Sequence, residues 1–589
     1  MKRVLMGMVM AAAVSVTAAA QVATMFPPVR GTREMVGAAN NQQVEAGMRL
    51  LAAGGNAVDA GVAAVLAAAV TEQSRFGLGG EMPLIVKMAD RAPVVVSAIG
   101  VAPRLATAEW YRKREAEVWE TGERKPPIPS LGIRSAVTPG VFDGLMLALS
   151  EHGTRSYCEV AAPAIEAAGG FPIGEEYAKF IGDFAEILRL WPDSAAFFLK
   201  EDRAPKPGEV FRSPVLGRTL EMLCQVEKKA RGNRAAKLEA VRREFAEGSI
   251  AKRIAAFSEA QGGLLRYEDL AGYRAELDAP RSIEYRGYTV VKPGFWSQGP
   301  VLLQALAILE GFDLKGMGHN GPEYLHTVIE AVKLAFADRD RYYGDPKHAE
   351  IPEKMLLSRE YAAERRGQID AGRASLEHRP GAFGGPLDLE AVDGDSGDHD
   401  TTCVNVIDRW GNAFSATPSG AWLPSVIAGD TGIPLSTRLQ SFVLTPGHAN
   451  VLAPGKRPRV TLSPTMVLKD GKPWLVMSTP GGDNQDQAML QVLLNLIEFG
   501  MGPQAAVEAP RFQTEHYYGS FAFHEFGPGR VALESRLPAG TIERMLELGH
   551  RVTTRGPWSN TSAPVAIRWE GGVLDGGADP RRSRFVFGR

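Results

Sequence analysis

The sequence predicts a mixed α/β protein, because helical and extended patterns of apolar residues alternate along it. Residues 42–53 and 57–71 have apolar side chains at helical spacing. Residues 82–87 and 93–98 are short apolar runs with β-branched side chains, which is typical of strands. A further strand pattern at residues 402–408 lies far downstream, so strands are expected in both halves of the chain.

Further helical segments are expected at residues 210–261, from Pro300 onward, and at residues 324–343 and 485–499. Residues 210–261 interleave Lys and Arg with Glu, which indicates a solvated helix face. Residues 371–400 differ from all of these segments, because Gly, Pro and acidic residues accumulate there. That composition predicts either a mobile tail or a plain surface loop.

The strand pattern at residues 402–408 continues into a predicted β-hairpin. Gly411 closes a three-residue loop with its backbone in the left-handed conformation, so Asp408 pairs with Asn412. Because a slip of one residue would send every side chain to the other face of the strand, this register decides which side chains meet.

In this register Thr401 lies opposite Ser419, with Cβ atoms about 4.5–5.5 Å apart. A threonine hydroxyl is a poor nucleophile without a base, and a free α-amino group on the same residue can serve as that base. Cleavage between Asp400 and Thr401 would create this amine and expose the nucleophile. The alternative is an ordinary hairpin whose threonines only form a strand.

These residues resemble the γ-glutamyltranspeptidase family of amino-terminal-nucleophile (Ntn) hydrolases. The small subunit of that family begins with a Thr-Thr pair, matched here by Thr401-Thr402, followed by a strand, an Asp-x-x-Gly-Asn turn and a second strand. Other segments that match family signatures, in order, are residues 52–60, 77–80, 138–140, 297–300, 335–339, 343–346, 463–465, 480–482 and 578–581.

The resemblance implies a four-layer αββα sandwich formed jointly by two autoproteolytic fragments, residues 21–400 and 401–589. It implies that Thr401 is the nucleophile, that Ser419 assists it, and that the backbone N–H groups of Gly481 and Gly482 hold the oxyanion. A mere tight turn is the alternative for the two glycines. The chemistry needs no cofactor, and the 10 histidines show no metal-binding spacing, so no metal site is expected.

The acyl-binding pocket departs from the family pattern. The Arg that holds a substrate α-carboxylate is missing from the segment that begins at Ile99, and Ser441 stands where an Asp receives the α-amino group. Paired serines become Val460-Thr461. Each lost charged hydrogen bond weakens glutamyl recognition by about 1.5–3 kcal/mol. Arg438 replaces a neutral side chain, and we expect it to offer a new carboxylate contact.

We therefore expect an autoprocessed, exported amide hydrolase of this family with an altered acyl-binding pocket. One alternative is a genuine glutathione hydrolase or γ-glutamyltransferase with a rebuilt pocket. The other is a non-catalytic binding protein on the same fold, which would not need the nucleophile and oxyanion residues. The expected partners are a small-molecule amide substrate and the sister fragment of the same precursor. A net charge of −2 favours no nucleic acid.

Residues 1–20 have the features of a secretory signal, with Lys2 and Arg3 before an apolar run and Ala18-Ala19-Ala20 as the cleavage site. We expect a periplasmic or secreted protein without stable membrane insertion once the signal is removed, and an uncleaved anchor is the alternative. Cys158, Cys224 and Cys403 cannot all pair within one chain. Export permits one disulfide, but single buried thiols are the favoured expectation.

Overall fold

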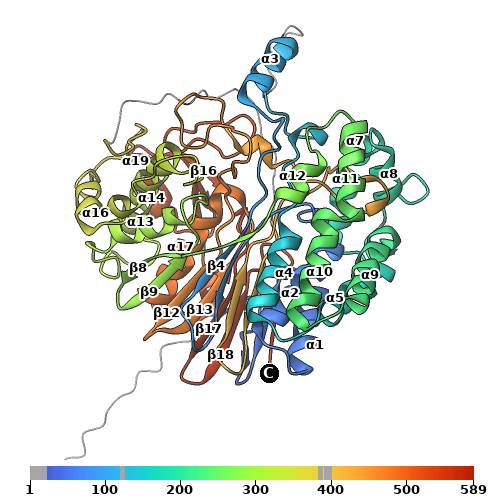
Figure 1. The fold of residues 1–589 in the computed structure, drawn as a ribbon. Helices are drawn as coiled ribbons and strands as arrows, with labels where there is room; N and C mark the ends of the chain where they lie inside the picture. Colours follow the sequence, from blue (N-terminus) through green and yellow to red (C-terminus); the bar gives the residue numbers. More distant parts are fainter. Residues whose placement is uncertain (1–22, 120–125, 383–388, 390–400) are drawn as a thin grey trace, which may run out of the picture.

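Two seven-stranded sheets lie face to face at the centre of the computed structural model, and helices cover the outer side of each (Figure 1). The structure describes residues 23–119, 126–382, 389 and 401–589. The expected signal at residues 1–20, Asp400 and most of the acidic tail lie outside the described residues. In the ranges described, no helix is both long enough and apolar enough to cross a membrane.

The first sheet mixes strands from both sides of the expected cleavage point. The central strands β10 and β11 come after it, and they pair with β2 and β3, which come before it. The sheet order is β19 (Phe585–Gly588), β2 (Met35–Ala38), β10 (Val404–Ile407), β11 (Ala413–Ala416), β3 (Met82–Lys87), β4 (Val94–Ala98) and β7 (Glu276–Asp278).

The second sheet is also antiparallel and also mixed. Its order is β1 (Val29–Gly31), β18 (Val573–Ala578), β17 (Val565–Glu570), β13 (Lys472–Ser478), β12 (Thr465–Lys469), β9 (Tyr288–Lys292) and β8 (Arg281–Tyr285). Two small sheets lie outside the sandwich. They contain β14 (Phe512–Thr514), β15 (Arg530–Glu534) and β16 (Arg551–Arg555) in one, and β5 (Phe171–Pro172) and β6 (Val210–Phe211) in the other.

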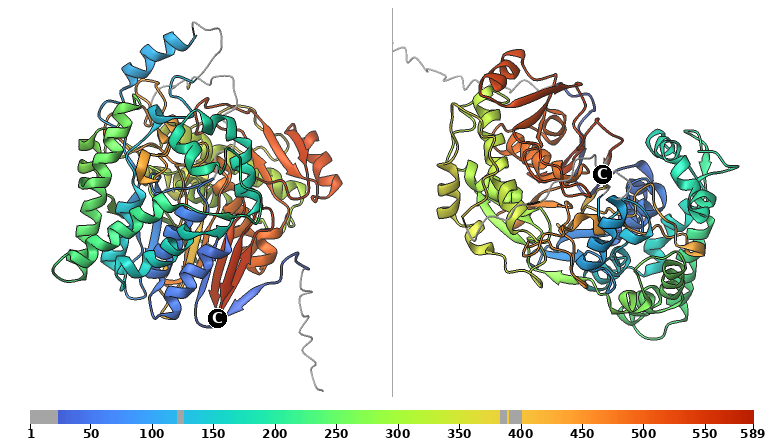
Figure 2. Two further views of the ribbon diagram at one scale, coloured as in Figure 1. Left: turned by 90° about the vertical axis from the view of Figure 1, so that its right-hand side faces the viewer. Right: turned by 90° about the horizontal axis from the view of Figure 1, so that it is seen from above.

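The helices form two outer layers on opposite sides of the sheets (Figure 2). The layer on the first sheet contains α1 (Asn41–Ala52), α2 (Ala57–Thr71), α4 (Val141–His152), α5 (Tyr157–Gly169), α6 (Glu175–Asp183), α7 (Ala185–Arg189), α8 (Pro192–Phe198), α9 (Pro214–Lys229), α10 (Arg234–Glu247), α11 (Ser249–Ala260) and α12 (Tyr267–Gly272). The layer on the second sheet contains α13 (Pro300–Leu309), α14 (Pro322–Tyr342), α15 (Glu353–Leu356), α16 (Arg359–Arg366), α17 (Gln485–Ile497), α18 (Pro503–Glu508) and α19 (Ala539–Glu547). Helix α3 (Ala108–Trp119) projects from the body.

Three apolar clusters separate the four layers. One lies between α1, α2 and their neighbours and the first sheet, and a second lies between α13, α14, α17 and the second sheet. The third fills the space between the sheets, where Ile85 and Ile407 of the first sheet and Met466, Val476 and Ile567 of the second belong to one cluster. Each layer buries one apolar face against the next, which confirms the four-layer αββα sandwich.

Most of the expected elements form at the expected places. Helix α2 and strand β3 have the predicted bounds, and Pro300 is the first residue of α13. The prediction of a helical stretch over 210–261 was wrong in detail, because it contains strand β6 and three separate helices. Gly232, with φ +107°, lies in the break between α9 and α10, and Asn233 caps the start of α10. Gly248 separates α10 from α11.

The expectation of single buried thiols was wrong for two of the three cysteines. Cys158 of α5 and Cys224 of α9 form a disulfide, with Cα atoms 5.1 Å apart and a sequence separation of 66. The pairing depends on α5 packing beside α9, which residue spacing does not reveal. Cys403 is a buried thiol two residues from Thr401.

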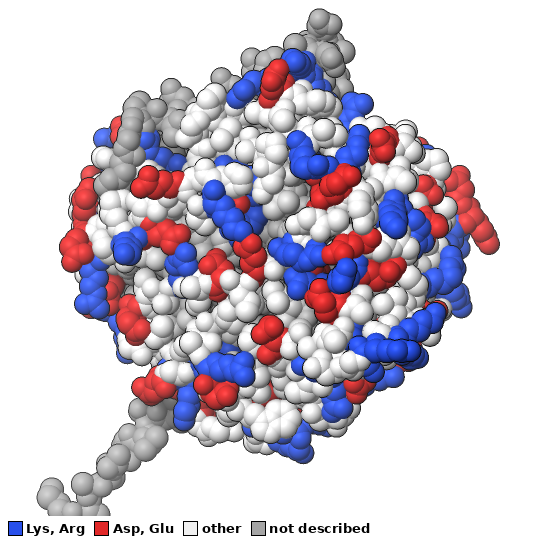
Figure 3. All heavy atoms as spheres, viewed as in Figure 1, with Lys and Arg blue, Asp and Glu red and all other residues white. Residues whose placement is uncertain are grey.

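The charged residues are mixed rather than segregated on the face drawn in Figure 3, where Lys and Arg lie among Asp and Glu. This distribution agrees with the net charge of −2. Neither property favours the broad electrostatic attraction on which nucleic-acid binding depends.

Candidate active site

The hairpin of β10 and β11 positions Thr401. Its observed register pairs Val404 with Ala416, and the same register continues to an isolated bridge between Thr401 and Ser419. The backbone N–H of Asp408 donates to the carbonyl of Asn412 at 3.0 Å. Gly411 has φ +87°, so the left-handed turn and the predicted register are both confirmed.

The Thr401 hydroxyl is buried in a polar environment. Its Oγ1 donates to Ser419 Oγ at 3.2 Å, and the Gln485 side-chain amide donates to the same Oγ1 at 3.4 Å. The next residue is anchored as well, since the N–H of Thr402 donates to the Pro418 carbonyl at 3.0 Å. The Thr401 hydroxyl is therefore held by neighbours from two different segments of the chain.

A buried ion pair lies directly behind Ser419. The Nη2 of Arg438 donates to Ser419 Oγ at 3.2 Å, while Nε of the same guanidinium binds the carboxylate of Glu81. Ser436 Oγ donates to the other Glu81 oxygen at 2.9 Å. Burial raises the pKa of Glu81, and the Arg438 charge offsets this rise in part. The structure thus places Arg438 beside the nucleophile pair.

One corner of the Arg438 guanidinium remains available. Its Nη1 is buried and has no hydrogen-bond partner in the described part of the chain, and its Cζ lies 4.6 Å from the centre of the Trp422 ring. Arg438 and Ser441 lie on one 3₁₀ turn, Arg438–Ser441, and the Ser441 hydroxyl is also buried without a partner among the described residues. Both side chains can therefore bind a polar group that enters from outside.

The remaining pocket candidates are not brought together with these two residues. Ile99 and Val460 belong to the apolar cluster between the sheets, and Val460 is held by backbone hydrogen bonds with Trp296 and Gln298. Thr461 is buried. Ile99 and Val460 offer apolar side chains, whereas Arg438 and Ser441 offer polar groups.

Gly481 and Gly482 form the turn between β13 and α17, as predicted. Gly481 has φ +116° and Gly482 has φ +53°. Neither amide donates a hydrogen bond to any described residue. The amide of Asn484, in contrast, donates to the Gly481 carbonyl at 2.9 Å. Two unused N–H groups at the start of a helix are suited to an anionic oxygen.

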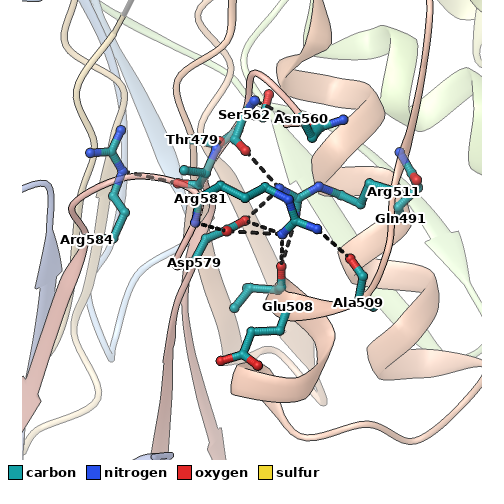
Figure 4. Close-up of polar contacts among 12 residues, drawn as sticks. Thr479, Gln491, Glu508, Ala509, Arg511, Asn560, Ser562, Asp579, Arg581 and Arg584 are labelled. Carbon is teal, nitrogen blue, oxygen red and sulfur yellow. Dashed lines mark hydrogen bonds and ion pairs between the residues drawn. The ribbon is translucent and has the colours of Figure 1, made fainter. Parts of the chain in front are cut away.

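Ser562 fixes the position of Gly481. A Cβ atom on Gly481 would lie 2.2 Å from Ser562 Oγ, so only glycine fits at this position. Arg511 donates to the Ser562 carbonyl at 2.8 Å and to Asp579 at 2.6 Å. Figure 4 shows Arg511 and Arg581 converging on Asp579, with Ser562 above them. The segment 578–581 therefore supports the glycine turn from behind.

A second support comes from the other side of the expected cleavage point. Arg339 of α14 is fully buried. It binds Asp340 at 2.6 Å and also binds Asp483, the residue after Gly482. Ser520 adds a backbone N–H to Asp483 at 2.9 Å. Burial alone would raise the pKa of Asp340, but the Arg339 charge holds it well below its usual value.

The described residues offer one compact group of potential metal ligands, His326, Glu330 and His550. Most of their ligand atoms already have partners. His326 Nδ1 lies 2.9 Å from His550 Nε2, and the two Glu330 oxygens bind Lys333 at 2.6 Å and Arg379 at 3.0 Å. Because two cations already neutralise the only carboxylate, we assign no metal ion to this group.

Sequence reasoning missed two residues that touch this site, Gln485 and Glu81. Gln485 is 84 residues from Thr401, and Glu81 is 357 residues from Arg438. Glu81 directly follows the predicted signature 77–80, and Gln485 lies three residues after Gly482. These adjacent motifs are the only signals in the sequence that point to them.

Comparison with known proteins identifies the family. A family model described as gamma-glutamyltranspeptidase matches residues 44–588. The glutathione hydrolase-like YwrD proenzyme of Bacillus subtilis (strain 168) is 33% identical over 565 residues, covering 95% of this chain and 98% of that protein. The acylase ACY 1 proenzyme of Pseudomonas sp. (strain SE83) is 32% identical over 529 residues, covering 89% and 88% of the two chains.

Solved structures agree with the sequence relatives. LmbA2991HD superposes with a TM-score of 0.88 at 35% identity, covering 96% of this chain and 100% of that chain. Cephalosporin acylase from Bacillus halodurans superposes with a TM-score of 0.82 at 29% identity, covering 96% and 98%. The chain therefore belongs to the γ-glutamyltranspeptidase family and is an enzyme of the Ntn-hydrolase type.

Proposed function

We propose that this protein is a self-cleaving amide hydrolase whose nucleophile is the hydroxyl of Thr401. The observation that carries the proposal is the 3.2 Å contact between Thr401 Oγ1 and Ser419 Oγ, at the start of the small fragment. Relatives named as proenzymes are consistent with a precursor that must be cut.

The reaction begins with scission of the bond between Asp400 and Thr401, which leaves an α-amino group on Thr401. This amine takes the proton of the Thr401 hydroxyl as Oγ1 attacks the substrate carbonyl carbon. The carbonyl oxygen becomes an oxyanion that the N–H groups of Gly481 and Gly482 stabilise. The proton passes to the leaving amine, and an acyl-enzyme remains. Water then attacks the ester and restores the hydroxyl.

The two fragments remain together as a heterodimer after the cut. Five strand pairings join residues 21–400 to residues 401–589, namely β1–β18, β2–β10, β2–β19, β3–β11 and β9–β12, so separation would break all five and expose the apolar clusters. The features of residues 1–20 favour export to the periplasm or beyond.

The acyl group carries a carboxylate and lacks the α-ammonium of a γ-glutamyl group. Arg438 Nη1 is a buried donor that lacks an acceptor among the described residues, and a substrate carboxylate would supply one. No acidic side chain replaces the family's Asp at Ser441, and Glu81 is already bound by Arg438 and Ser436. An α-ammonium would therefore enter beside a guanidinium without a counter-ion, which is costly when buried.

Denaturing gels and intact masses test the scission. Purified protein should give two fragments that divide before Thr401, and Thr401→Ala should give one uncut chain. A wild-type chain that folds but remains uncut under all conditions would refute the proposal.

A matched pair of chromogenic substrates tests the acyl group. Glutaryl and γ-glutamyl p-nitroanilides differ only in the α-ammonium. We expect kcat/KM to be about 10–100-fold higher for the glutaryl compound, since both compounds offer the same carboxylate but only the γ-glutamyl compound brings a buried ammonium beside the Arg438 guanidinium. A preference for γ-glutamyl would favour a glutathione hydrolase instead.

A further inference from the structure

Gln485 contacts the nucleophile from a position that the proposed mechanism does not yet use. It is the first residue of α17 and is fully buried. Its Nε2 lies 3.4 Å from Thr401 Oγ1, while its Oε1 is buried and has no hydrogen-bond partner in the described part of the chain. One half of this carboxamide is therefore engaged with the reacting oxygen, and the other half lacks a donor.

The neighbouring side chains have different partners. Asn484 Nδ2 donates to Asn560 at 2.8 Å, and Asp486 binds Lys292 at 2.8 Å. Gln487 donates to the Thr514 carbonyl at 3.1 Å, away from Thr401. The direction of Gln485 toward the hydroxyl is thus specific to position 485 and is not shared along the helix.

A buried amide oxygen without a donor costs about 1–3 kcal/mol, and a donor that forms after scission would remove this cost at Gln485 Oε1. Scission before Thr401 provides that donor, because it converts a peptide nitrogen into an amine with additional hydrogens. The nitrogen and Oγ1 of a threonine are separated by two carbons, and the two heteroatoms of a carboxamide by one. A single carboxamide can therefore contact both.

We propose that Gln485 is a catalytic residue that binds the hydroxyl of Thr401 through Nε2 and the released α-amino group through Oε1. This inference rests on the proposed function, since the amine exists only after scission. When the amine takes the hydroxyl proton, Oε1 accepts a hydrogen bond from the ammonium that forms. Gln485 thereby holds the base and the nucleophile in the geometry that proton transfer requires.

The charged groups around Thr401 are paired among themselves. Arg438 pairs with Glu81 behind Ser419, Arg339 pairs with Asp483, and Lys292 pairs with Asp486. Glu72 accepts a hydrogen bond from Thr402 and lies beside Arg75. These groups are the same in every variant at position 485, so a change in the pH profile reports the new side chain itself.

Two substitutions test the proposal on the cleaved enzyme. Gln485→Glu keeps the shape but puts a carboxylate beside the amine, which should raise the pKa of the amine and move the acid limb of kcat/KM up by about one unit or more. Gln485→Met removes both hydrogen bonds and should lower kcat about 10–100-fold with little change in KM. Gln487→Glu is the matched control, with a new carboxylate on α17 that faces away from Thr401, and it should keep the wild-type acid limb.

The outcomes are distinguishable. An unshifted acid limb in Gln485→Glu, or a wild-type kcat in Gln485→Met, would overturn the role of Gln485 while leaving the nucleophile in place. If Gln485→Met remains uncut, the acid limb of kcat/KM in Gln485→Glu alone decides whether Gln485 has the proposed role. If both variants fold by circular dichroism but remain uncut, the role lies in scission and the catalytic proposal is wrong. A wild-type chain that never cleaves would instead refute the proposed function.

Discussion

Arg339 binds Asp483, so a residue from before the expected cleavage point holds the glycine turn that lies after it. The guanidinium also binds Asp340, and all three side chains are buried. The two fragments therefore share one ion cluster at the candidate oxyanion site. A movement of α14 relative to α17 would therefore shift the backbone of Gly481 and Gly482.

Arg339→Met should destabilise the protein strongly. It leaves Asp340 and Asp483 as buried charges without their main partner, and removal of one member of a buried pair costs about 3–5 kcal/mol. The free energy of unfolding in urea, measured on chains that carry Thr401→Ala and remain one polypeptide, would show the loss. Lys469→Met is the control, because Lys469 and Glu570 form an exposed pair and should change stability by about 0–1 kcal/mol. Equal effects of the two substitutions would contradict the structural role of Arg339.

Ser419→Ala should slow both self-cleavage and turnover. The substitution removes the acceptor of the Thr401 hydroxyl and leaves Arg438 Nη2 without its oxygen, so we expect kcat to fall about 10–100-fold. The rate of fragment appearance on gels and kcat of the mature enzyme measure the two steps. Ser419→Thr keeps the hydroxyl and should retain most of both rates, whereas a loss equal to that of the alanine variant would point to packing alone.

Arg438→Gln should change which acyl group the enzyme accepts. It removes the donor that we assign to the substrate carboxylate and also the partner of Glu81. Because both p-nitroanilides carry the carboxylate, kcat/KM should fall about tenfold or more for each, and the ratio of glutaryl over γ-glutamyl should also fall because no guanidinium repels the α-ammonium. Arg438→Gln/Glu81→Gln removes the unpaired carboxylate and separates its effect from that of the lost donor. An unchanged kcat/KM for glutaryl p-nitroanilide in both variants would remove Arg438 from acyl recognition.

Gly481→Ala should abolish most activity, because its Cβ would meet Ser562 Oγ at 2.2 Å and its φ is +116°. Either the turn or Ser562 must move, and the two amides would leave the oxyanion position. We expect kcat to fall about 100-fold or more, as for the loss of an oxyanion donor. Gly471→Ala is the control, since its φ is +74° and its surroundings are open. If kcat fell equally in both variants, backbone strain rather than the contact with Ser562 would explain the loss of activity.

Stability should fall in mild acid because several histidines are buried in the neutral form. Burial lowers the pKa of His448 from 6.5 to about 4 and that of His516 to about 3. The unfolded chain therefore takes up protons first as the pH drops below about 6.5. The free energy of unfolding should fall by up to about 1.4 kcal/mol per pH unit for each histidine. Urea unfolding of the Thr401→Ala chain from pH 7 to pH 4 should show this slope, and His448→Gln should reduce it. A pH-independent free energy over this range would contradict the burial of neutral histidines.

Local features of the sequence were sufficient for the hairpin. The strand pattern and Gly411 set the register of β10 and β11, and that register brings Thr401 to Ser419. The bounds of α2 and β3 followed from apolar spacing for the same reason, because each depends on residues only a few positions apart. The four layers themselves came from the resemblance of many ordered segments and not from spacing.

Contacts between distant segments could not be predicted from the sequence. The pairing of Cys158 with Cys224 required two helices to pack side by side, and the contact of Gln485 with Thr401 required α17 to begin beside the hairpin. The Glu81–Arg438 pair spans 357 residues. Nothing in residue order favours these partners over others of the same type.

By itself, the sequence determined the hairpin that carries Thr401 and the family. The hairpin depends on neighbours within a few positions, and the family depends on the identity of many ordered segments along the chain. Only the tertiary structure decided that Arg438 lies behind Ser419, that Arg339 and Ser562 hold the glycine turn, and that Gln485 reaches the hydroxyl. Those contacts exist because the layers bury their apolar faces together, and a buried polar group that is hydrogen-bonded avoids most of the cost of burial.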